Sequence, residues 1–516
     1  DIGIYFFLFA VLSGKVFFKE AIHQSLPYLG FLTEPLFVYF LLLLLSAIHL
    51  SRQTFTLLQS HIKPSLLFLL SFVFVILVGS GLLMLPNATV HGIHFVDALF
   101  ISTTSVCVTG LTTVDVATTF THTGHIIIMF LIQIGGIGVM TFTSFFALSF
   151  MGHSSFTSKL VLKDMLNEDR VNGLFRVILN ILFVTLFIEG VGAYLIYLDI
   201  KGGLPGGTQE EVFYAVFHAV SAFCNAGIST LSGNMYDPLV AQKYNLHVWI
   251  ALLIVFGGLG FPIVFNYLKL LRHLLVNTFK IVIGQQKHYI HTPRIININT
   301  YIVMISTLVL LAGGTFFYYL LEMDNTLAGL PFSGQLANAF LGAVTPRTAG
   351  FCVADMGTLA TGTLMLTLIL MIIGAAPMST GGGLKVTTVC VALLTAHNAA
   401  RGKENVEIRK REISPETIRR AFATIVFYFC WLGAAVWILS ITEKDVSVFT
   451  LTFEVVSALS TVGLSLNFSP LLSISGKLVI IFTMLVGRIG ILAFFISFYK
   501  EYKKKNYTYP QENILM

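Results

Sequence analysis

The chain has 516 residues, of which 56% are hydrophobic and 11% are charged, and its formal net charge is +6. Too few polar side chains remain to cover several soluble domains, so the composition excludes a soluble globular protein and predicts an all-α polytopic membrane protein. The five cysteines are odd in number and lie mostly in apolar sequence, so we expect no disulfide framework.

Long apolar runs predict membrane-spanning helices. Runs that reach the roughly 20 residues needed to cross a bilayer are 65–85, 125–150, 174–198, 249–271, 301–321, 364–394, 421–441 and 478–498. Two earlier runs, 2–18 and 35–50, are near the short limit. The first contains Lys15 and is followed by no small-residue cleavage site, so we interpret it as a span and not as a signal peptide.

One nine-residue motif recurs four times, at 104–112, 221–229, 344–352 and 457–465. Each copy holds one glycine, and these glycines recur about every 115 residues, at Gly110, Gly227, Gly350 and Gly463. A phenylalanine stands ten residues before each glycine, at Phe100, Phe217, Phe340 and Phe453. The four motifs are defined without these phenylalanines, so the matching positions of the phenylalanines indicate one unit repeated four times.

The repeats divide the chain. An N-terminal two-helix extension at 1–60 is expected to precede four tandem membrane–pore-loop–membrane repeats. Their predicted bounds are 61–152, 170–275, 295–400 and 415–500, with a cytoplasmic tail at 501–516. Each repeat is expected to hold a spanning helix, a half-length helix, the glycine motif and a second spanning helix.

The half-length helix before each motif indicates that the motif lies inside the membrane. In the first repeat it covers 95–106, and a dozen helical residues span roughly 18 Å, too little to cross a bilayer. Such a segment must dip in and return, which is tolerated where it lines a water-filled cavity. Glycine can turn carbonyl oxygens towards that cavity, and rings of carbonyls replace the hydration shell of an alkali cation. The predicted ligands are the carbonyls of Val108, Thr109, Gly110, Asn225, Ala226, Gly227, Thr348, Ala349, Gly350, Thr461, Val462 and Gly463.

A plainer interpretation is that these glycines only allow helices to pack closely. Packing would explain one glycine per repeat, but it would not explain the short preceding helix with its phenylalanine. We therefore favour a pore.

Basic residues predict the orientation. They are concentrated in the connections after the second span of each repeat, for example at Lys159, Arg272 and Arg409. By the positive-inside rule these connections face the cytoplasm, so the pore loops face outside. Acidic residues of the outer segments, such as Asp115 and Asp355, either concentrate cations at the pore mouth or are ordinary solvated loop charges; both interpretations stay open.

The second spans carry glycine clusters, and that of the third repeat differs from the others. At 135–138, 257–260 and 487–490 we expect the glycines to serve packing or bending. In the third repeat Pro377 removes a backbone donor and three glycines follow, so the helix is predicted to be interrupted over 374–383. An irregular segment below a filter is a candidate gate, with a structural kink as the alternative.

Arg488 lies in the last span with apolar sequence on both sides. An arginine at mid-membrane should face the interior of the protein and have partners there, and the carbonyls of the 374–383 break are the expected partners. Its charge beside the ion path would be a barrier to cations. For Lys385 a functional and a structural role stay open. The predicted gate residues are Gly374, Pro377, Gly381, Gly382, Gly383, Lys385 and Arg488.

Three other charged residues in apolar sequence have structural interpretations. Glu189 is expected to make an interhelical hydrogen bond, Asp97 to cap the start of its helix, and Arg347 to brace the third motif. The sequence contains no HExxH pair, no paired cysteines and no nucleotide-binding glycine loop after a strand. We therefore predict that the protein is not an enzyme.

Taken together, five motifs resemble those of the Trk/Ktr/HKT potassium transporter superfamily, and within it the bacterial Trk-type potassium uptake membrane subunit. They are the segments 108–111, 225–227, 345–351, 379–385 and 487–490. The resemblance covers about 65–500, and the two additional N-terminal helices favour the Trk branch.

The resemblance implies four repeats in a pseudo-fourfold array, one pore per subunit, a homodimer, and a location in the bacterial cytoplasmic (inner) membrane. It implies a gating loop matching 374–383 and an opposing arginine matching Arg488. A ring of cytosolic nucleotide-binding regulatory subunits would be the partner, and no nucleic acid or cofactor is expected. In this superfamily glycine in all four motifs accompanies potassium, whereas serine in the first accompanies sodium. K⁺ is therefore the expected ion, with Rb⁺ as a surrogate.

Two departures limit this expectation. No motif has the second glycine of a potassium-channel Gly-Tyr-Gly sequence, so looser selectivity is expected. Cys224 and Ile228 stand where asparagine and phenylalanine are more usual. The alternative function is an ion-coupled secondary transporter of a small solute or sodium. Such proteins have inverted or twofold repeats, and four parallel units argue against it.

Overall fold

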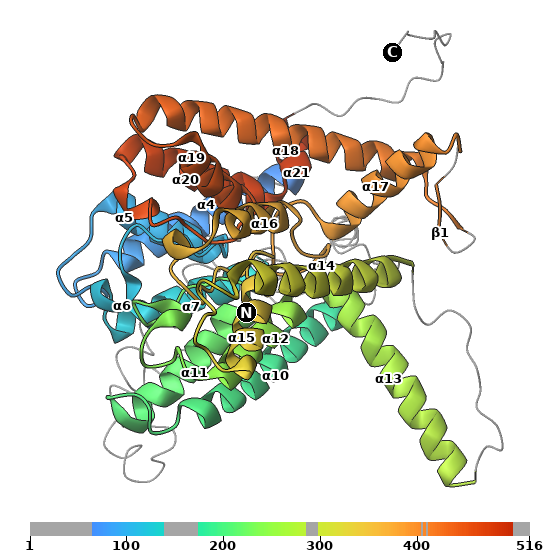
Figure 1. Cartoon of the computed structure of the whole chain (residues 1–516), viewed down its shortest axis with the longest axis horizontal. Helices are drawn as coiled ribbons and strands as arrows, with labels where there is room; N and C mark the ends of the chain where they lie inside the picture. Colours follow the sequence, from blue (N-terminus) through green and yellow to red (C-terminus); the bar gives the residue numbers. More distant parts are fainter. Residues whose placement is uncertain (1–63, 139–173, 285–297, 404–405, 409–410, 499–516) are drawn as a thin grey trace, which may run out of the picture. The chain divides into compact units, whose positions relative to one another are not determined.

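The computed structural model describes residues 64–138, 174–284, 298–403, 406–408 and 411–498. The chain forms two units, one comprising Asp1–Leu67 with Val139–Asn180 and the other Phe68–Gly138 with Ile181–Met516. Nearly all described residues belong to the second unit. Figure 1 shows their helices. The predicted extension at 1–60, with its runs 2–18 and 35–50, and the predicted tail at 501–516 lie outside the described residues.

The first repeat contains α4 (Pro64–Leu83), α5 (Phe95–Val106), α6 (Val116–Thr119) and α7 (His122–Ile137). The half-length helix predicted at 95–106 is α5. Helix α7 begins after Thr121, whose hydroxyl accepts a hydrogen bond from the Gly124 amide. It ends at Ile137, and the following Gly138 has φ +88°, a conformation that suits glycine. The rest of the span predicted at 125–150 lies outside the described residues.

The second repeat contains α10 (Leu174–Ile200), α11 (Gly207–Phe223), η3 (Asn234–Tyr236), α12 (Tyr244–Gly258) and α13 (Phe261–Val282). The span predicted at 249–271 is broken at its glycine cluster, as one of the two roles expected for 257–260. Helix α12 ends at Gly258 and α13 starts at Phe261, because Gly260 between them has φ +85°. A hydropathy pattern cannot detect this break, since the residues on both sides of it are apolar.

The third repeat contains α14 (Ile298–Glu322), α15 (Phe332–Val344), η4 (Met356–Thr358), α16 (Thr361–Ile372) and α17 (Val386–Ala400). The chain between α16 and α17 is not helical, as the proline and glycines of 374–383 predict. Two short antiparallel strands follow, β1 (Glu407–Ile408) and β2 (Arg411–Glu412), with Glu407 opposite Glu412.

The fourth repeat contains α18 (Pro415–Thr442), α19 (Val448–Leu459), η5 (Ser469–Leu471), α20 (Ile474–Ile489) and α21 (Ile491–Phe498). The span predicted at 478–498 is bent at its glycine cluster, as one of the two roles expected for 487–490, and α20 and α21 meet at an angle of 95°. Gly490 between them has φ +90°. Arg488 is therefore in the last turn of α20 and not at the centre of a long span.

Several helices are long and apolar enough to cross a membrane. Among the described residues these are Leu179–Ile200, Ile298–Glu322 and Pro415–Thr442, and the bent pair α20–α21 passes the same test if it is counted as one span. They expose large apolar side chains, including Phe183 at 71%, Leu308 at 69% and Trp437 at 67%. Such a surface suits a lipid environment and not water.

The half-length helices lie in the interior. Phe100, Phe217 and Phe453 are fully buried, and Phe340 is partly buried. The second helices approach the carboxyl ends of the half-length helices at glycines. A Cβ on Gly135 would collide with the Val106 carbonyl, one on Gly257 with the Phe223 carbonyl and one on Gly487 with the Leu459 carbonyl. These glycines therefore serve close packing.

Candidate ion-binding site

The four motifs share an unusual backbone. The residue two positions before each glycine has positive φ: +54° at Val108, +63° at Asn225, +73° at Thr348 and +51° at Thr461. The glycines themselves have φ of +98°, +67°, +75° and +91° along the chain. Left-handed conformations are costly for β-branched valine and threonine, and such strain is concentrated at functional sites. The surrounding structure must therefore hold these segments in place.

Hydrogen bonds to the half-length helices hold the motif amides. The Thr109 amide donates to the Thr104 carbonyl at 2.8 Å, and the Gly110 amide donates to the Thr104 hydroxyl at 2.9 Å. In the fourth repeat the Val462 and Gly463 amides donate in the same way to the carbonyl and hydroxyl of Ser457, at 2.8 and 3.1 Å. The C=O and N–H of a trans peptide point in opposite directions. The carbonyls of Thr109 and Val462 therefore point away from their own helices.

The other two motifs are held by related bonds. The Ser221 hydroxyl donates to the Ile228 carbonyl, and the Thr345 hydroxyl donates to the Phe351 carbonyl, both at 2.7 Å. The hydroxyls of Thr104, Ser221 and Ser457 all stand six residues before their glycines. An alignment of the repeats could have revealed them. In the third repeat Val344 takes that position, and the hydroxyl comes one residue later.

The four glycines lie together. A Cβ on Gly110 would be 2.5 Å from the Ala226 carbonyl oxygen, and a Cβ on Gly350 would be 2.7 Å from that of Val462. Gly227 and Gly463 face the carbonyl oxygens of Ala349 and Thr109 in the same way. Each motif glycine therefore lies against the carbonyl of the residue just before the glycine of the next motif. The glycine of the fourth motif lies against the first motif in the same way, so the four contacts form a closed ring. Four equivalent carbonyl oxygens and four glycines therefore gather in one place.

The segment between α16 and α17 lies against these motifs. Positions where a Cβ would project from Gly381 and Gly382 are occupied by the hydroxyls of Thr348 and Thr461. The Thr380 hydroxyl donates to the Phe223 carbonyl at 3.2 Å, and its amide donates to the Gly257 carbonyl at 3.3 Å. At the ends of the segment, the Gly374 amide donates to the Leu384 carbonyl at 2.9 Å.

Two basic side chains hold this segment. Arg488 donates to the Thr380 carbonyl with one terminal nitrogen and to the Gly135 carbonyl with the other. Lys385 donates to the Gly381 carbonyl at 2.6 Å. Pro377 lies beside α13, where a Cβ on Gly260 would be 2.6 Å from the Pro377 carbonyl oxygen. The structure thus brings the predicted gate residues close to the motif residues, and Arg488 bridges two repeats.

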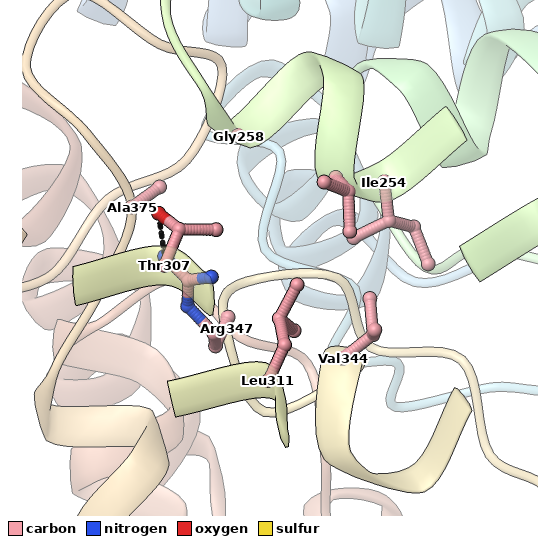
Figure 2. A pocket seen from close by; sticks show the side chains of 8 residues that line it. Ile254, Gly258, Thr307, Leu311, Val344, Arg347 and Ala375 are labelled. Carbon is pink, nitrogen blue, oxygen red and sulfur yellow. Dashed lines mark hydrogen bonds between the residues drawn. The ribbon is translucent and has the colours of Figure 1, made fainter. Parts of the chain in front are cut away.

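The Arg347 side chain lies against α14. Figure 2 shows its side chain beside Thr307, Leu311 and Ala375 in a small pocket. It is 7% exposed, and its Nη2 donates to the Thr307 hydroxyl at 3.4 Å. The predicted bracing of the third motif therefore takes place through α14.

The prediction that Asp97 caps its helix is wrong. The N-cap residue of α5 is His94, and Asp97 lies in the first turn. One carboxylate oxygen of Asp97 accepts hydrogen bonds from the Thr113 hydroxyl and from Lys477 on α20, both at 2.7 Å. No pattern in the sequence indicates this ion pair, because Lys477 lies 380 residues away.

Polar bonds join the outer loops in pairs. The Ser232 hydroxyl donates to Asp115 at 2.6 Å, and the Asn467 side chain donates to Asp355 at 2.8 Å. Burial, together with the nearby carboxylates of Asp355, Asp115 and Asp237, raises the pKa of the Tyr236 phenol. Carboxylates from different repeats therefore lie close to one side chain.

Comparisons with known proteins assign the family. The family model TrkH, described as a cation transport protein, matches residues 71–509. The chain is 34% identical to the potassium/sodium uptake protein NtpJ of Enterococcus hirae, over 89% of this chain and 98% of the relative. It is 36% identical to the Ktr system potassium uptake protein B of Vibrio alginolyticus, over 82% and 88% of the two chains. The crystal structure of the potassium transporter TrkH from Vibrio parahaemolyticus matches with a TM-score of 0.64 and 17% identity, covering 84% of each chain. The resemblance found in the sequence motifs is thereby confirmed, and the chain belongs to the TrkH family of cation transport proteins.

Proposed function

We propose that this protein takes up potassium through a central pore lined by the four glycine motifs. The observation that carries the proposal is the ring in which Gly110, Gly227, Gly350 and Gly463 meet the carbonyl oxygens of neighbouring motifs. The printed names of the relatives, which describe potassium uptake, support the same cation.

Selection in this proposal is made by backbone carbonyls. The ion loses water and is coordinated by carbonyls of 108–110, 225–227, 348–350 and 461–463, which replace its hydration shell. The amides of Gly110 and Gly463 are already bonded to hydroxyls behind the ring. The carbonyls that precede these glycines are therefore oriented before the ion arrives.

The segment 374–383 and Arg488 form the gate. Gly381 and Gly382 lie against Thr348 and Thr461, so the segment covers one end of the ring. Arg488 and Lys385 place two positive charges on its carbonyls. Displacement of the segment would open the path, and the hydrogen bonds that Thr380 makes to the Gly257 carbonyl and accepts from Arg488 would have to break.

The remaining features belong to the same proposal. The four repeats form a pseudo-fourfold array in the bacterial cytoplasmic membrane, with the pore loops facing outside. Two copies form a homodimer, and nucleotide-binding regulatory subunits dock on the basic cytoplasmic side. Sodium is the second candidate cation, because one relative is named for both potassium and sodium.

Ion flux into liposomes containing the purified protein tests the proposal. We expect uptake of Rb⁺ that is inhibited by external K⁺, with weaker inhibition by Na⁺. Uptake of an amino acid or sugar driven by an ion gradient, without independent Rb⁺ flux, would instead favour a secondary transporter of small solutes. No Rb⁺ flux under any gradient would end the potassium assignment.

A further inference from the structure

A buried carboxyl group lies beside the second motif and has no role in the proposed pore. Glu189 on α10 is 5% exposed. The Gln133 side-chain amide on α7 donates to its Oε2 at 2.9 Å. The Cys224 thiol, at the end of α11 and next to the motif residue Asn225, lies 3.7 Å from its Oε1. Carboxyl groups inside membranes are rare and are mostly functional.

No cation neutralises this carboxyl group within the part of the chain that the structure describes. The ion pairs there are Arg420–Glu416 and Lys477–Asp97. The groups facing Glu189 from α7 and α11 are the neutral Gln133 and Cys224, and α12 contributes Leu253 against Gly192. The positive charge of Arg488, whose guanidinium bonds the Thr380 carbonyl, also acts electrostatically on Cys224. An ionised Glu189 is thus held by two neutral donors, of which the thiol is weak.

The three side chains can be satisfied with or without a proton on Glu189. The thiol sulfur is equally far, 3.7 Å, from Oε1 of Gln133 and from Oε1 of Glu189. When Glu189 is ionised, the thiol donates to Glu189. When Glu189 is protonated, its hydroxyl can donate to the sulfur, which is also an acceptor, and the thiol donates to Gln133. Gln133 donates to Oε2 in both arrangements. Only the direction of the two hydrogen bonds to the Cys224 sulfur changes, and the added proton comes from water.

We propose that Glu189 is a proton-binding site that adjusts cation affinity at the second motif. Cys224 precedes Asn225 of that motif, and a Cβ on Gly136 would collide with the Cys224 sulfur. Gly135, the neighbouring residue, accepts the hydrogen bond from Arg488. A negative charge on Glu189 attracts a cation to the motif and partly offsets the Arg488 charge. Protonation removes both effects.

Two measurements test the site, and the first is independent of transport. Difference infrared spectroscopy of the purified protein should show a carboxylic C=O band that appears as the pH falls and is missing in Glu189→Gln. In Cys224→Val the band should move to higher frequency, because the hydroxyl loses its acceptor, whereas Cys224→Ser should keep it hydrogen-bonded. A wild-type spectrum without any band assignable to Glu189 overturns the proposal.

The second measurement rests on the proposed function. As Glu189 ionises, the apparent KM for Rb⁺ should fall roughly fivefold or more, because a negative charge in a low-dielectric environment beside the second motif stabilises a bound cation. Glu189→Gln should keep the high KM at every pH, while the exposed control Glu416→Gln should follow the wild type. Equal pH profiles in Glu189→Gln and wild type overturn the coupling. Absence of Rb⁺ uptake in the wild type would count against the transport function alone, since the infrared band would still report the proton site.

Discussion

Arg488 on α20 donates a hydrogen bond to the carbonyl oxygen of Thr380, which lies 108 residues earlier in the segment between α16 and α17. The other end of the same guanidinium bonds the Gly135 carbonyl in the first repeat. One side chain thus ties the first, third and fourth repeats together beside the motif ring. Substitution of Arg488 therefore tests most directly whether these contacts keep the pore closed.

Replacing Arg488 with alanine should raise Rb⁺ flux about tenfold or more. A tenfold change corresponds to about 1.4 kcal/mol, which is less than the roughly 4 kcal/mol between unit charges 4 Å apart at an effective dielectric constant of 20. Flux into liposomes measures this. Arg488→Lys keeps the charge but cannot bridge both carbonyls, so it should give an intermediate flux. Unchanged flux in Arg488→Ala would rule out a barrier at this residue.

Replacing Gly110 with serine should reduce selectivity for K⁺ over Na⁺ at least about tenfold. The new Cβ would be 2.5 Å from the Ala226 carbonyl oxygen, so that carbonyl must move and the ring must widen or distort, which changes coordination. The relative inhibition of Rb⁺ uptake by K⁺ and Na⁺ measures selectivity. Gly92→Ser is the matched control, because Gly92 has φ +81° with no atom within 4 Å of its Cβ position. Equal selectivity in both variants would refute the role of Gly110.

Replacing Thr104 with valine should loosen the first motif at nearly constant side-chain volume. The Gly110 amide loses its acceptor, and an unsatisfied buried amide costs about 1–3 kcal/mol. We expect lower thermal stability and weaker K⁺ selectivity, both measured on the purified protein. Thr104→Ser keeps the hydroxyl and should resemble the wild type. If valine and serine behave alike, the hydroxyl has no part in holding Gly110.

The ion pair Asp97–Lys477 should stabilise the contact between α5 and α20. Both side chains are 15% exposed, so we expect a coupling free energy near the upper end of the range for accessible pairs, about 1 kcal/mol. A double-mutant cycle with Asp97→Asn and Lys477→Met measures it from unfolding stability. The exposed pair Glu416–Arg420, at 65% and 71% exposure, should give less than about 0.5 kcal/mol. Additive effects at Asp97 and Lys477 would exclude the coupling.

Features set by nearby residues could be predicted from the sequence. The half-length helix at 95–106 follows from its length and turn residues, and the interruption over 374–383 follows from Pro377 and three glycines. The family followed from motifs that each lie within a few residues, and the comparisons confirm it. Long apolar runs also predicted α10 and α14 to within a few residues at both ends. For α18 they predicted the end, but the helix starts earlier, at Pro415.

Only the tertiary structure decided how distant residues meet. The order in which each motif glycine faces the next motif, the pairing of Lys477 with Asp97, and the bond from Arg488 to Gly135 all join residues more than 100 positions apart. Neither hydropathy nor motif spacing encodes such contacts, because they depend on how folded helices pack. The glycine clusters at 257–260 and 487–490 indicated packing or bending, but only the structure decided between the two: a glycine in an apolar run is compatible with a helix, and packing selects the positive φ of Gly260 and Gly490.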